Sequence, residues 1–416
     1  MNVMTKAASA SPVPAQATGG SWPQLPPVPA SPARAAVARA LIARMAARLP
    51  IRIELPGGDV LGAGGPGAPA AVVHRPAAFF ARVSSGTAGF AESYMAGDWD
   101  CTDLPALFAV LTAHLPELVP GPLQRLRRLY IPGRRPEQEG TAEASRRNIE
   151  SHYDLSNDFF ALFLDPTLTY SSAFFGPGDT LAQAQGRKID RMLDLTGTGP
   201  GTRLLEIGTG WGELALRAAR RGARVTSLTI SPAQRERAIS RATEAGLAGQ
   251  IDVQLRDYRA ARGSYDAVVS VEMIEAVGAP YWDEYFRVID AVLGPGGRAG
   301  IQAITMPHDR MLATHSGQSW IHKYIFPGGQ IPSMRAIAGS LAGTSLQITS
   351  DLAMGTHYAR TLASWRERFH AAEAGIAALG FSPQFRRMWY LYLAYAEAGF
   401  RAGYLDVHQL VLERGR

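Results

Sequence analysis

The feature that most constrains the fold is a glycine-rich turn between a short apolar segment and an amphipathic one. Residues 203–207 read Arg-Leu-Leu-Glu-Ile, an apolar run of strand length, and Gly208, Gly210 and Gly212 follow in a G-x-G-x-G pattern. Residues 214–221 then have the apolar spacing of a helix. Glycines between a strand and a helix let the backbone approach a ligand and leave helix N–H groups free for its polar atoms. The turn therefore predicts an α/β domain with a ligand site.

The segments after this turn continue the alternation of strands and helices. Short apolar runs predict strands at 223–230, 251–255, 266–271 and 297–304. A longer amphipathic run at 232–245 predicts a helix. Apolar strands that alternate with helices are typical of βαβ units and a parallel sheet. The pattern predicts a doubly wound, Rossmann-like α/β domain in residues 141–416.

A smaller folded unit is expected ahead of this domain, in residues 36–120. Its apolar spacing predicts a helix at 37–49, and alternation predicts a strand at 51–55. A second short strand is expected at 79–83. The unit is therefore predicted to be α+β. Residues 1–35, which are mostly Ala, Pro, Ser and Gly, are expected to form a disordered tail.

The two folded units are expected to be joined by an arginine-rich linker at 121–140. Arg125, Arg127 and Arg128 lie in it among Leu126 and Leu129. One interpretation is an interfacial patch that meets anionic lipid head groups. The other is a solvated linker in a protein that uses arginine for nearly all its positive charge.

Composition excludes several classes of protein. Hydrophobic residues make up 46% of the 416, charged residues only 19%, and the net charge is +6, which argues against a nucleic-acid binder. The single cysteine, Cys101, forms no internal disulfide and supplies no multi-cysteine metal site, so no metal is expected. No apolar run reaches the roughly 18 residues of a membrane span. A cytoplasmic protein in peripheral contact with the inner face of the membrane is expected.

Two details of the glycine turn indicate which ligand it binds. The spacing is not the G-x-G-x-x-G of dinucleotide sites, and the second strand ends at 228–231 without an acid for a nicotinamide ribose. Glu206 precedes the turn instead, and Asp257 and Tyr258 follow the third strand, where they are placed to hold an adenine. These features favour an S-adenosylmethionine site in a methyltransferase. A nucleotide-dependent oxidoreductase and a fold with an inactive site remain as alternatives.

Several motifs follow one another along the chain: H-Y-D-L-S-N-D-F at 152–159, Y-S at 170–171, E-I-G-T-G-W-G at 206–212, L-T-I-S at 228–231 with Gln234, V-E-M-I-E-A-V-G at 271–278, K-Y-I-F-P-G-G at 323–329 and Y-A-R-T-L at 358–362. With these motifs the chain resembles the cyclopropane-fatty-acyl-phospholipid synthase family, whose members are S-adenosylmethionine-dependent lipid C-methyltransferases. The resemblance covers about residues 40–414 and implies a class I methyltransferase fold with a lipid-contacting N-terminal domain. With the turn, it implies a cofactor site made of Tyr170, Ser171, Glu206, Gly208, Gly210, Gly212, Thr229, Ser231, Gln234, Asp257 and Tyr258.

The chain departs from the family pattern at the place where ring-closing members hold a bicarbonate base. Those members have Cys where this chain has Ser172, and His where it has Ala276 and Gln302. Glu275 and Tyr358 remain. The missing thiol and imidazole make bicarbonate a doubtful second cofactor.

The catalytic residues expected from the same blocks are Glu275, Tyr358, Ser172 and His152. Glu275 is expected to be the acid of its block that faces the pocket. It would stabilise a carbocation and direct, or carry out, the deprotonation.

The function expected from these features is methylation of the double bond in unsaturated phospholipid acyl chains at the membrane surface. A methyl- or methylene-branched product is favoured over a cyclopropane, because a carboxylate base need not reach the new methyl group. Cyclopropane-fatty-acyl-phospholipid synthase activity is the first alternative. More distant alternatives are a noncatalytic lipid-binding protein and a small-molecule methyltransferase. A homodimer is a further expectation, although the sequence does not determine the oligomeric state.

Overall fold

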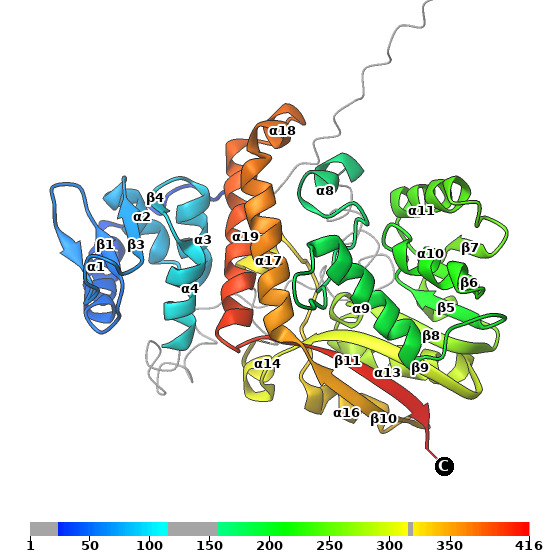
Figure 1. The fold of residues 1–416 in the computed structure, drawn as a ribbon. Helices are drawn as coiled ribbons and strands as arrows, with labels where there is room; N and C mark the ends of the chain where they lie inside the picture. The colour runs from blue at the N-terminus through cyan, green and yellow to red at the C-terminus, as the bar shows by residue number, and fades with distance from the viewer. Residues whose placement is uncertain (1–23, 115–155, 315–318, 416) are drawn as a thin grey trace, which may run out of the picture.

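The computed structural model describes residues 24–114, 156–314 and 319–415 (Figure 1). Within these ranges the second half of the chain forms a seven-stranded sheet whose order is β10-β11-β9-β8-β5-β6-β7. The strands are β5 (Arg203–Ile207), β6 (Arg224–Thr229), β7 (Ile251–Leu255), β8 (Tyr265–Val271), β9 (Leu293–Thr305), β10 (Leu346–Ala353) and β11 (Asp406–Arg414).

The topology of this sheet places a ligand site at the end of β5. β5 pairs in parallel with β6 on one side and with β8 on the other, so the order of the strands reverses there. In open α/β sheets, ligands bind at such a switch point, outside the carboxyl ends of the strands. β11 runs antiparallel to both β9 and β10. The expected doubly wound α/β fold is confirmed.

Both faces of the sheet are buried, which explains why its strands are nearly continuous apolar runs. Leu204 and Val269 belong to a core with α9 (Leu181–Leu195) and α10 (Glu213–Arg220). Leu205 and Val268 point to the other face, where α13 (Trp282–Val292) and α16 (Met334–Leu341) pack. α11 (Pro232–Glu244) follows β6 and packs against β6 and β7.

The N-terminal residues form a second, smaller sheet with the order β2-β1-β3-β4. Its strands are β1 (Arg52–Glu54), β2 (Val60–Leu61), β3 (Ala70–Val73) and β4 (Trp99–Cys101), and its helices are α1 (Pro32–Ala46), α2 (Pro76–Val83), α3 (Thr87–Met95) and α4 (Leu104–Ala113). β1 and β3 are parallel, and the other pairs are antiparallel. This N-terminal unit is therefore α+β, as expected.

Two details of the N-terminal prediction differ from the structure. The strand expected at 79–83 is wrong, because these residues lie in α2, which has a proline in its first turn and buries Phe79 and Phe80 next to each other. α1 begins at Pro32, inside the segment expected as a tail, and the Ser31 side chain caps it by accepting from Arg34 N. The arginine-rich segment 121–140 and the boundary at 141 lie outside the described residues.

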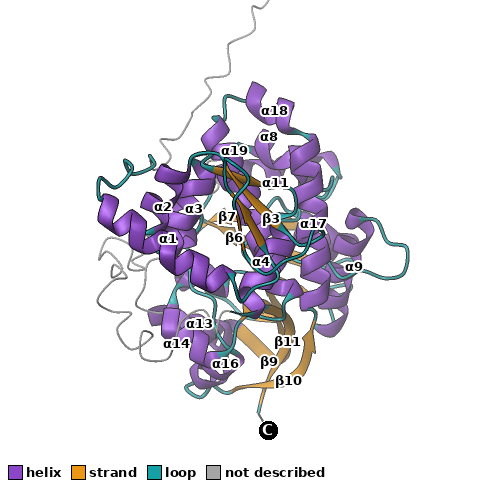
Figure 2. Ribbon diagram, turned by 90° about the vertical axis from the view of Figure 1, so that its left-hand side faces the viewer, coloured by secondary structure: helices purple, strands orange, loops and turns teal. Residues whose placement is uncertain are grey.

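Helices α17 (Gly355–Ala371) and α19 (Pro383–Arg401) separate the N-terminal unit from the large sheet (Figure 1). Figure 2 views the molecule from the side of the N-terminal unit. α19 packs against α3 and α4 as well as against α17. Arg387 on α19 donates to the carbonyl oxygens of Tyr94 (2.6 Å) and Trp99 (2.8 Å). Trp99 and Trp389 belong to one continuous apolar cluster, so the two units share a core.

A second polar contact joins the N-terminal unit to the loop region after β9. The Glu92 carboxylate on α3 accepts from Lys323 Nζ (2.6 Å) and from the Tyr324 hydroxyl (2.8 Å), both on α15 (Trp320–Tyr324). In the described part of the chain, no helix has the length and apolar character that crossing a membrane requires.

Candidate active site

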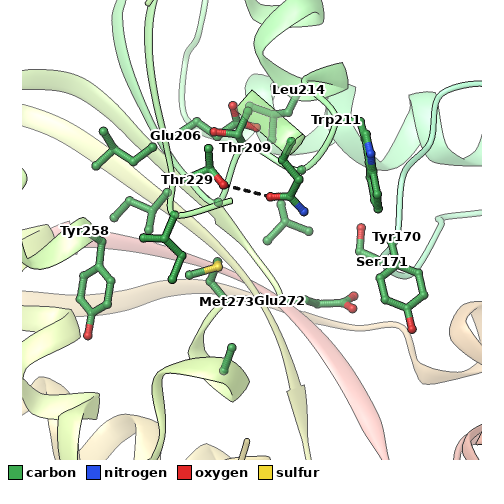
Figure 3. Close-up of a pocket in the computed structure, with 18 of the residues that line it drawn as sticks. Tyr170, Ser171, Glu206, Thr209, Trp211, Leu214, Thr229, Tyr258, Glu272 and Met273 are labelled. Atoms are coloured by element: carbon green, nitrogen blue, oxygen red, sulfur yellow. Dashed lines mark hydrogen bonds between the residues drawn. The ribbon is translucent and has the colours of Figure 1, made fainter. Parts of the chain in front are cut away.

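A cavity opens at the carboxyl ends of β5, β6, β7 and β8, at the switch point of the sheet (Figure 3). Residues predicted from the sequence that line it are Tyr170, Ser171, Glu206, Gly208, Gly210, Thr229, Gln234, Asp257 and Tyr258. Tyr258 stands at one side of the cavity, and Tyr170 and Ser171 stand at the other. The structure therefore brings together residues that are up to 88 positions apart in the chain.

The glycine turn is held by backbone contacts and leaves open space above Gly210. The amides of Gly208 and Thr209 donate to Leu228 O on β6 (3.0 and 3.1 Å). Gly210 has φ +51°, and a Cβ built on it would meet no other atom within 4 Å. Gly212 (φ +89°) does not line the cavity, since a Cβ there would lie 3.0 Å from the Ala238 Cβ on α11. Gly212 thus supports the turn through close helix packing.

Glu206 is the last residue but one of β5 and is buried near a second titratable group, Lys188. Its Oε2 forms a hydrogen bond with Ser227 Oγ, and burial raises the pKa of its carboxyl to about 8. Lys188 on α9 is 1% exposed, and burial lowers the pKa of its amine to about 8. Lys188 Nζ donates to Ser171 Oγ (2.6 Å), which fixes the Ser171 side chain at the cavity wall.

The end of β6 contributes a pair of hydrogen-bonded side chains. Thr229 Oγ1 donates to Gln234 Oε1 (3.0 Å), as Figure 3 shows. Ser231 does not line the cavity; its Oγ caps α11 by accepting from Gln234 N (3.3 Å). Ser231 therefore positions Gln234 rather than forming the wall itself.

Asp257 and Tyr258 follow β7, as predicted. Both Asp257 carboxylate oxygens accept from the Arg259 guanidinium (3.0 and 3.1 Å). The Tyr258 ring packs edge-to-face on Tyr285 (5.6 Å between centroids). The Tyr258 hydroxyl is buried and has no hydrogen-bond partner among the described residues. A buried, unpaired hydroxyl in a cavity wall favours a polar ligand at that place.

Aromatic rings form the wall of the opposite end. Tyr170 stacks on Trp365 (5.1 Å between centroids, 30° between planes) and lies 5.3 Å from the Phe160 ring. The Tyr170 hydroxyl is 2.9 Å from the Tyr392 hydroxyl on α19. Trp211 also lines the cavity, and its Nε1 donates to Asn157 Oδ1 (2.8 Å) on α8 (Asn157–Phe163).

Of the two acids in the block at 271–278, the one that lines the cavity is Glu272, directly after β8, and not Glu275 as the sequence analysis expected. Figure 3 shows the Glu272 carboxylate pointing toward Tyr170 and Ser171. Its Oε1 accepts from the backbone N of Ser172 (2.8 Å) and from Gln302 Nε2 (2.8 Å). Its Oε2 accepts from the Tyr358 hydroxyl (2.8 Å). Three donors thus converge on one carboxylate.

Glu275 lies one residue into the short helix α12 (Ile274–Val277), behind this wall. Its Oε1 accepts from the backbone N of Ile304 on β9, and its Oε2 is buried with no partner among the described residues. Burial, followed by the charge of Glu272, raises the pKa of Glu275 to about 8. Since α12 begins just after Glu272, its turn directs Glu275 toward the backbone of β9 instead of the cavity.

Two of the other expected catalytic residues, Ser172 and Tyr358, contact Glu272 without lining the cavity. Ser172 is fully buried, and its Oγ donates to Ala173 O (3.1 Å) while its backbone N contacts Glu272. Tyr358 is buried on α17 and contacts Glu272 through its hydroxyl. His152 lies outside the described residues. Residues 24–114, 156–314 and 319–415 contain no cluster of His, Cys, Asp or Glu suited to a metal ion.

A row of buried polar side chains extends from Glu272 to the far side of the sheet. Gln302 Oε1 accepts from Gln409 Nε2 (2.9 Å), and Gln409 Oε1 accepts from Arg191 (2.6 Å). Gln302 and Gln409 are fully buried on β9 and β11. Sequence reasoning did not assign roles to Glu272, Gln409 or Lys188. One feature of the sequence could have identified Glu272 as a residue of the site: it comes immediately after the carboxyl end of a predicted parallel strand.

The fold and the cavity define a class I S-adenosylmethionine-dependent methyltransferase. The open space at Gly210 fits the close approach of a ligand to the turn, and the unpaired Tyr258 hydroxyl fits a polar group beside it. The sequence profile described as mycolic acid cyclopropane synthetase matches residues 141–410. The chain belongs to this family.

Relatives with known names cover most of the chain. The tuberculostearic acid methyltransferase UfaA1 of Mycobacterium tuberculosis is 49% identical over 407 residues, which are 94% of this chain and 95% of that protein. The cyclopropane-fatty-acyl-phospholipid synthase of Escherichia coli is 36% identical over 351 residues, 84% of this chain and 89% of that protein. The chain is thus similar both to a protein named for a methylated fatty acid and to one named for a cyclopropane product.

Solved structures of the family align with the large domain. The cyclopropane synthase MmaA2 from Mycobacterium tuberculosis is 34% identical with a TM-score of 0.60, covering 64% of this chain and 97% of that one. The mycolic acid cyclopropane synthase CmaA1, in complex with SAH and CTAB, is 31% identical with a TM-score of 0.60, covering 65% and 98%. SAH is the demethylated form of the methyl donor, which supports S-adenosylmethionine as the cofactor of this enzyme.

Proposed function

We propose that this enzyme methylates the double bond of unsaturated phospholipid acyl chains and releases a methyl- or methylene-branched chain that is still unsaturated. The observation that carries the proposal is the composition of the cavity end at Tyr170. Aromatic rings and the Glu272 carboxylate meet there. The similarity over nearly the whole chain to a tuberculostearic acid methyltransferase supports an acyl substrate.

The cavity wall suits the charge that this reaction develops. S-adenosylmethionine, when bound, supplies a methyl group on a sulfonium sulfur. An alkene that receives this methyl through its π electrons is left with a cation on the neighbouring carbon. The face of an aromatic ring such as Tyr170 stabilises a desolvated cation by about 0.5–2 kcal/mol. A carboxylate beside it stabilises the same charge and accepts the proton that must leave.

We assign the cofactor to the residues that line the cavity between Tyr258 and Ser171. Asp257 and Tyr258 would hold the adenosine, where the Tyr258 hydroxyl needs a partner. The open turn at Gly210 and the buried Glu206 would hold the polar methionine end, with Thr229 and Gln234 between the two. A cofactor held by these residues would supply its methyl group at the end of the cavity that Tyr170 and Glu272 line.

A branched product is favoured over a cyclopropane by the surroundings of Ser172 and Gln302. At the positions where the resemblance implies a thiol and an imidazole, the Ser172 hydroxyl bonds to Ala173 O and the Gln302 amide bonds to Glu272 and Gln409. Neither side chain has the chemistry of a base at neutral pH. A cyclopropane is the alternative product, which the similarity to the synthase from Escherichia coli supports.

We also place the enzyme at the inner face of the membrane, because its proposed substrate is a phospholipid chain. Arg125, Arg127 and Arg128, which would meet anionic head groups, lie outside the described residues.

Proton NMR of the reaction product tests the proposal. Purified enzyme is incubated with S-adenosylmethionine and vesicles of a monounsaturated phospholipid, and the extracted lipid is examined for its new signals. Vinyl and branched-methyl signals, with one added methylene unit by mass spectrometry, are the expected result. Cyclopropyl signals upfield of the methyl region would show that the ring closes. Lipid of unchanged mass would reject the acyl substrate.

A further inference from the structure

The backbone of Glu272 has a conformation that few residues other than glycine adopt. Its φ is +52°, and among the described residues only Leu168 shares a positive φ without being glycine. A side chain in this region costs about 1–2 kcal/mol. Glu272 N donates to Gln302 O (2.7 Å), which holds the strained turn in place. Such strain persists where surrounding structure enforces it, and it concentrates at functional sites.

The donors around Glu272 are set to hold an ionised carboxylate. Ser172 N, Gln302 Nε2 and the Tyr358 hydroxyl all lie 2.8 Å from its oxygens. The orientation of the Gln302 amide is fixed because its oxygen accepts from Gln409 (2.9 Å). Gln409 is fixed in turn by Arg191, whose guanidinium only donates. The Gln302 NH₂ group must therefore face Glu272.

The same three donors are already engaged. The Ser172 amide, the Gln302 amide and the Tyr358 hydroxyl stand at positions where the resemblance implies bicarbonate contacts, and each already donates to Glu272. Bicarbonate therefore does not fit the described site. A carboxylate of the protein stands among the donors instead.

The two neighbouring carboxyl groups differ in their surroundings. Glu272 accepts three hydrogen bonds and lines the cavity, whereas Glu275 accepts one backbone bond and has an unpartnered oxygen. Burial raises the pKa of both, and the positive charge of Lys188 opposes the shift at Glu272. Glu272 thus has three donors and a positive charge that stabilise its ionised form, whereas Glu275 has one backbone donor. Two carboxyl groups whose environments differ in this way are typical of an acid–base site.

We infer that Glu272 is the built-in base of this methyltransferase and takes the proton from the methylated chain. This inference rests on the proposed function. After the methyl group has joined one alkene carbon, a C–H bond next to the cationic carbon breaks. Its electron pair forms a new C=C bond, and the proton passes to a Glu272 oxygen. If a hydride first moves from the methylated carbon to the cation, proton loss from the new methyl group gives a methylene branch.

Three variants of Glu272 test this role. Glu272→Gln keeps the shape of the side chain without its basicity, and turnover should fall by roughly 100-fold or more. Glu272→Gly suits the positive φ and leaves a hollow among the three donors. Its activity should be equally low, and added sodium formate should restore at least part of it by supplying a small carboxylate. Formate should leave the parent enzyme unchanged.

Glu272→Asp shortens the side chain by one methylene group and so moves the carboxylate. Its effect on the ratio of products distinguishes a base from a residue that only supports the structure. The variant should retain some turnover and change the ratio of branched isomers, because the base then reaches a different hydrogen. Glu236→Gln, an exposed change on α11, serves as the matched control and should behave like the parent. Cofactor affinity by calorimetry and the melting temperature show whether each variant is folded.

The outcomes separate this inference from the proposed function. If the parent methylates no unsaturated lipid, the proposed function fails. If the parent is active and Glu272→Gln stays within about twofold of it, Glu272 is not the base. A folded, cofactor-binding Glu272→Gly variant that formate does not restore also overturns the inference, since the carboxylate would then serve only to hold its neighbours.

Discussion

The two ends of the cavity are built in different ways. At the cofactor end, a continuous segment from β5 through Gly212 presents backbone atoms, and Leu228 on the next strand holds it. At the acid end, the Ser172 amide meets the side chains of Glu272, Gln302 and Tyr358, and the partners in each contact are 30 to 100 positions apart along the chain. The cofactor end depends on backbone shape, whereas the acid end depends on which side chains stand together.

This difference separates the two tasks that we propose for the cavity. The proposed cofactor position depends on the backbone of the turn. At the acid end, three donors contact the same carboxylate, so replacing one of them should alter the proposed base without touching the turn. Substitutions at the two ends should therefore affect different measured quantities.

The largest effect is expected at the cofactor end, from Gly210→Val. A branched side chain at φ +51° is strained and would project into the open space above the turn. We expect cofactor affinity to fall by about 100-fold or more in isothermal titration calorimetry, equivalent to about 3 kcal/mol. The fold should persist, because a Cβ at this position meets no other atom within 4 Å. Gly249→Val, an exposed change after α11, is the control. Unchanged affinity would remove the assigned cofactor position.

A smaller effect is expected at the acid end, from Tyr358→Phe. The variant keeps the ring, which packs on Phe400 (4.5 Å), and removes only the donor to Glu272 Oε2 (2.8 Å). Loss of a hydrogen bond to a charged group costs about 1.5–3 kcal/mol, so turnover should fall roughly 10-fold or more. Cofactor affinity should not change.

The pH profile of Tyr358→Phe sharpens this test. The hydroxyl stabilises the ionised form of Glu272, as do the Ser172 amide, the Gln302 amide and the charge of Lys188. Without the hydroxyl, the pKa of Glu272 should rise further, because one of the groups that stabilise its ionised form is gone. The acid limb of the activity profile should therefore move to higher pH. A limb that stays in place would contradict the contact between Tyr358 and the base.

The smallest effect is expected on stability, from Glu275→Gln. Burial raises the pKa of Glu275 from 4.5 to about 8. The folded protein therefore binds this proton more tightly than the unfolded chain does, and its contribution to stability is complete below pH 4.5 and is lost as pH rises through about 8. The neutral amide does not titrate, so the variant should lose less stability than the parent between pH 5.5 and 8.5.

Melting curves at these two pH values measure the difference, which should be about 2–4 °C for each kcal/mol. Glu206, whose pKa is also raised to about 8 by burial, should preserve part of the pH dependence in the variant. Equal pH dependence in variant and parent would mean that Glu275 is not buried in its acid form.

The sequence predicted the cofactor end more completely than the acid end. The strands at 203–207 and 251–255 were predicted to the residue, because apolar runs between turn residues mark buried strands. The glycine spacing predicted a turn after the first of these strands, and Gly208 and Gly210 line the cavity. Helix α2 was missed because a buried run such as Phe79–Val83 fits a strand or a helix equally until its proline start is considered.

The acid end was partly hidden because its partners come together only in the folded chain. Glu272 stands three residues before Glu275, and no local pattern says which of the two faces the cavity. The positive φ of Glu272 belongs to the folded backbone, and in that backbone it is Glu272 that lines the cavity. The contact between Arg191 and Gln409 spans 218 positions, so its role in orienting Gln302 depends on the pairing of β9 with β11.

The shared core between the N-terminal unit and α19 has a consequence during synthesis on the ribosome. The carbonyl oxygen of Trp99 accepts a hydrogen bond from Arg387, which lies 288 residues later in the chain. At about 5–20 residues per second, roughly 15–60 s pass between the emergence of the two. During this time the apolar surface that α19 will cover, near Phe108 and Trp99, is exposed to chaperones and proteases. A nascent chain that stops before α19 leaves this surface uncovered, which makes truncated products targets for degradation.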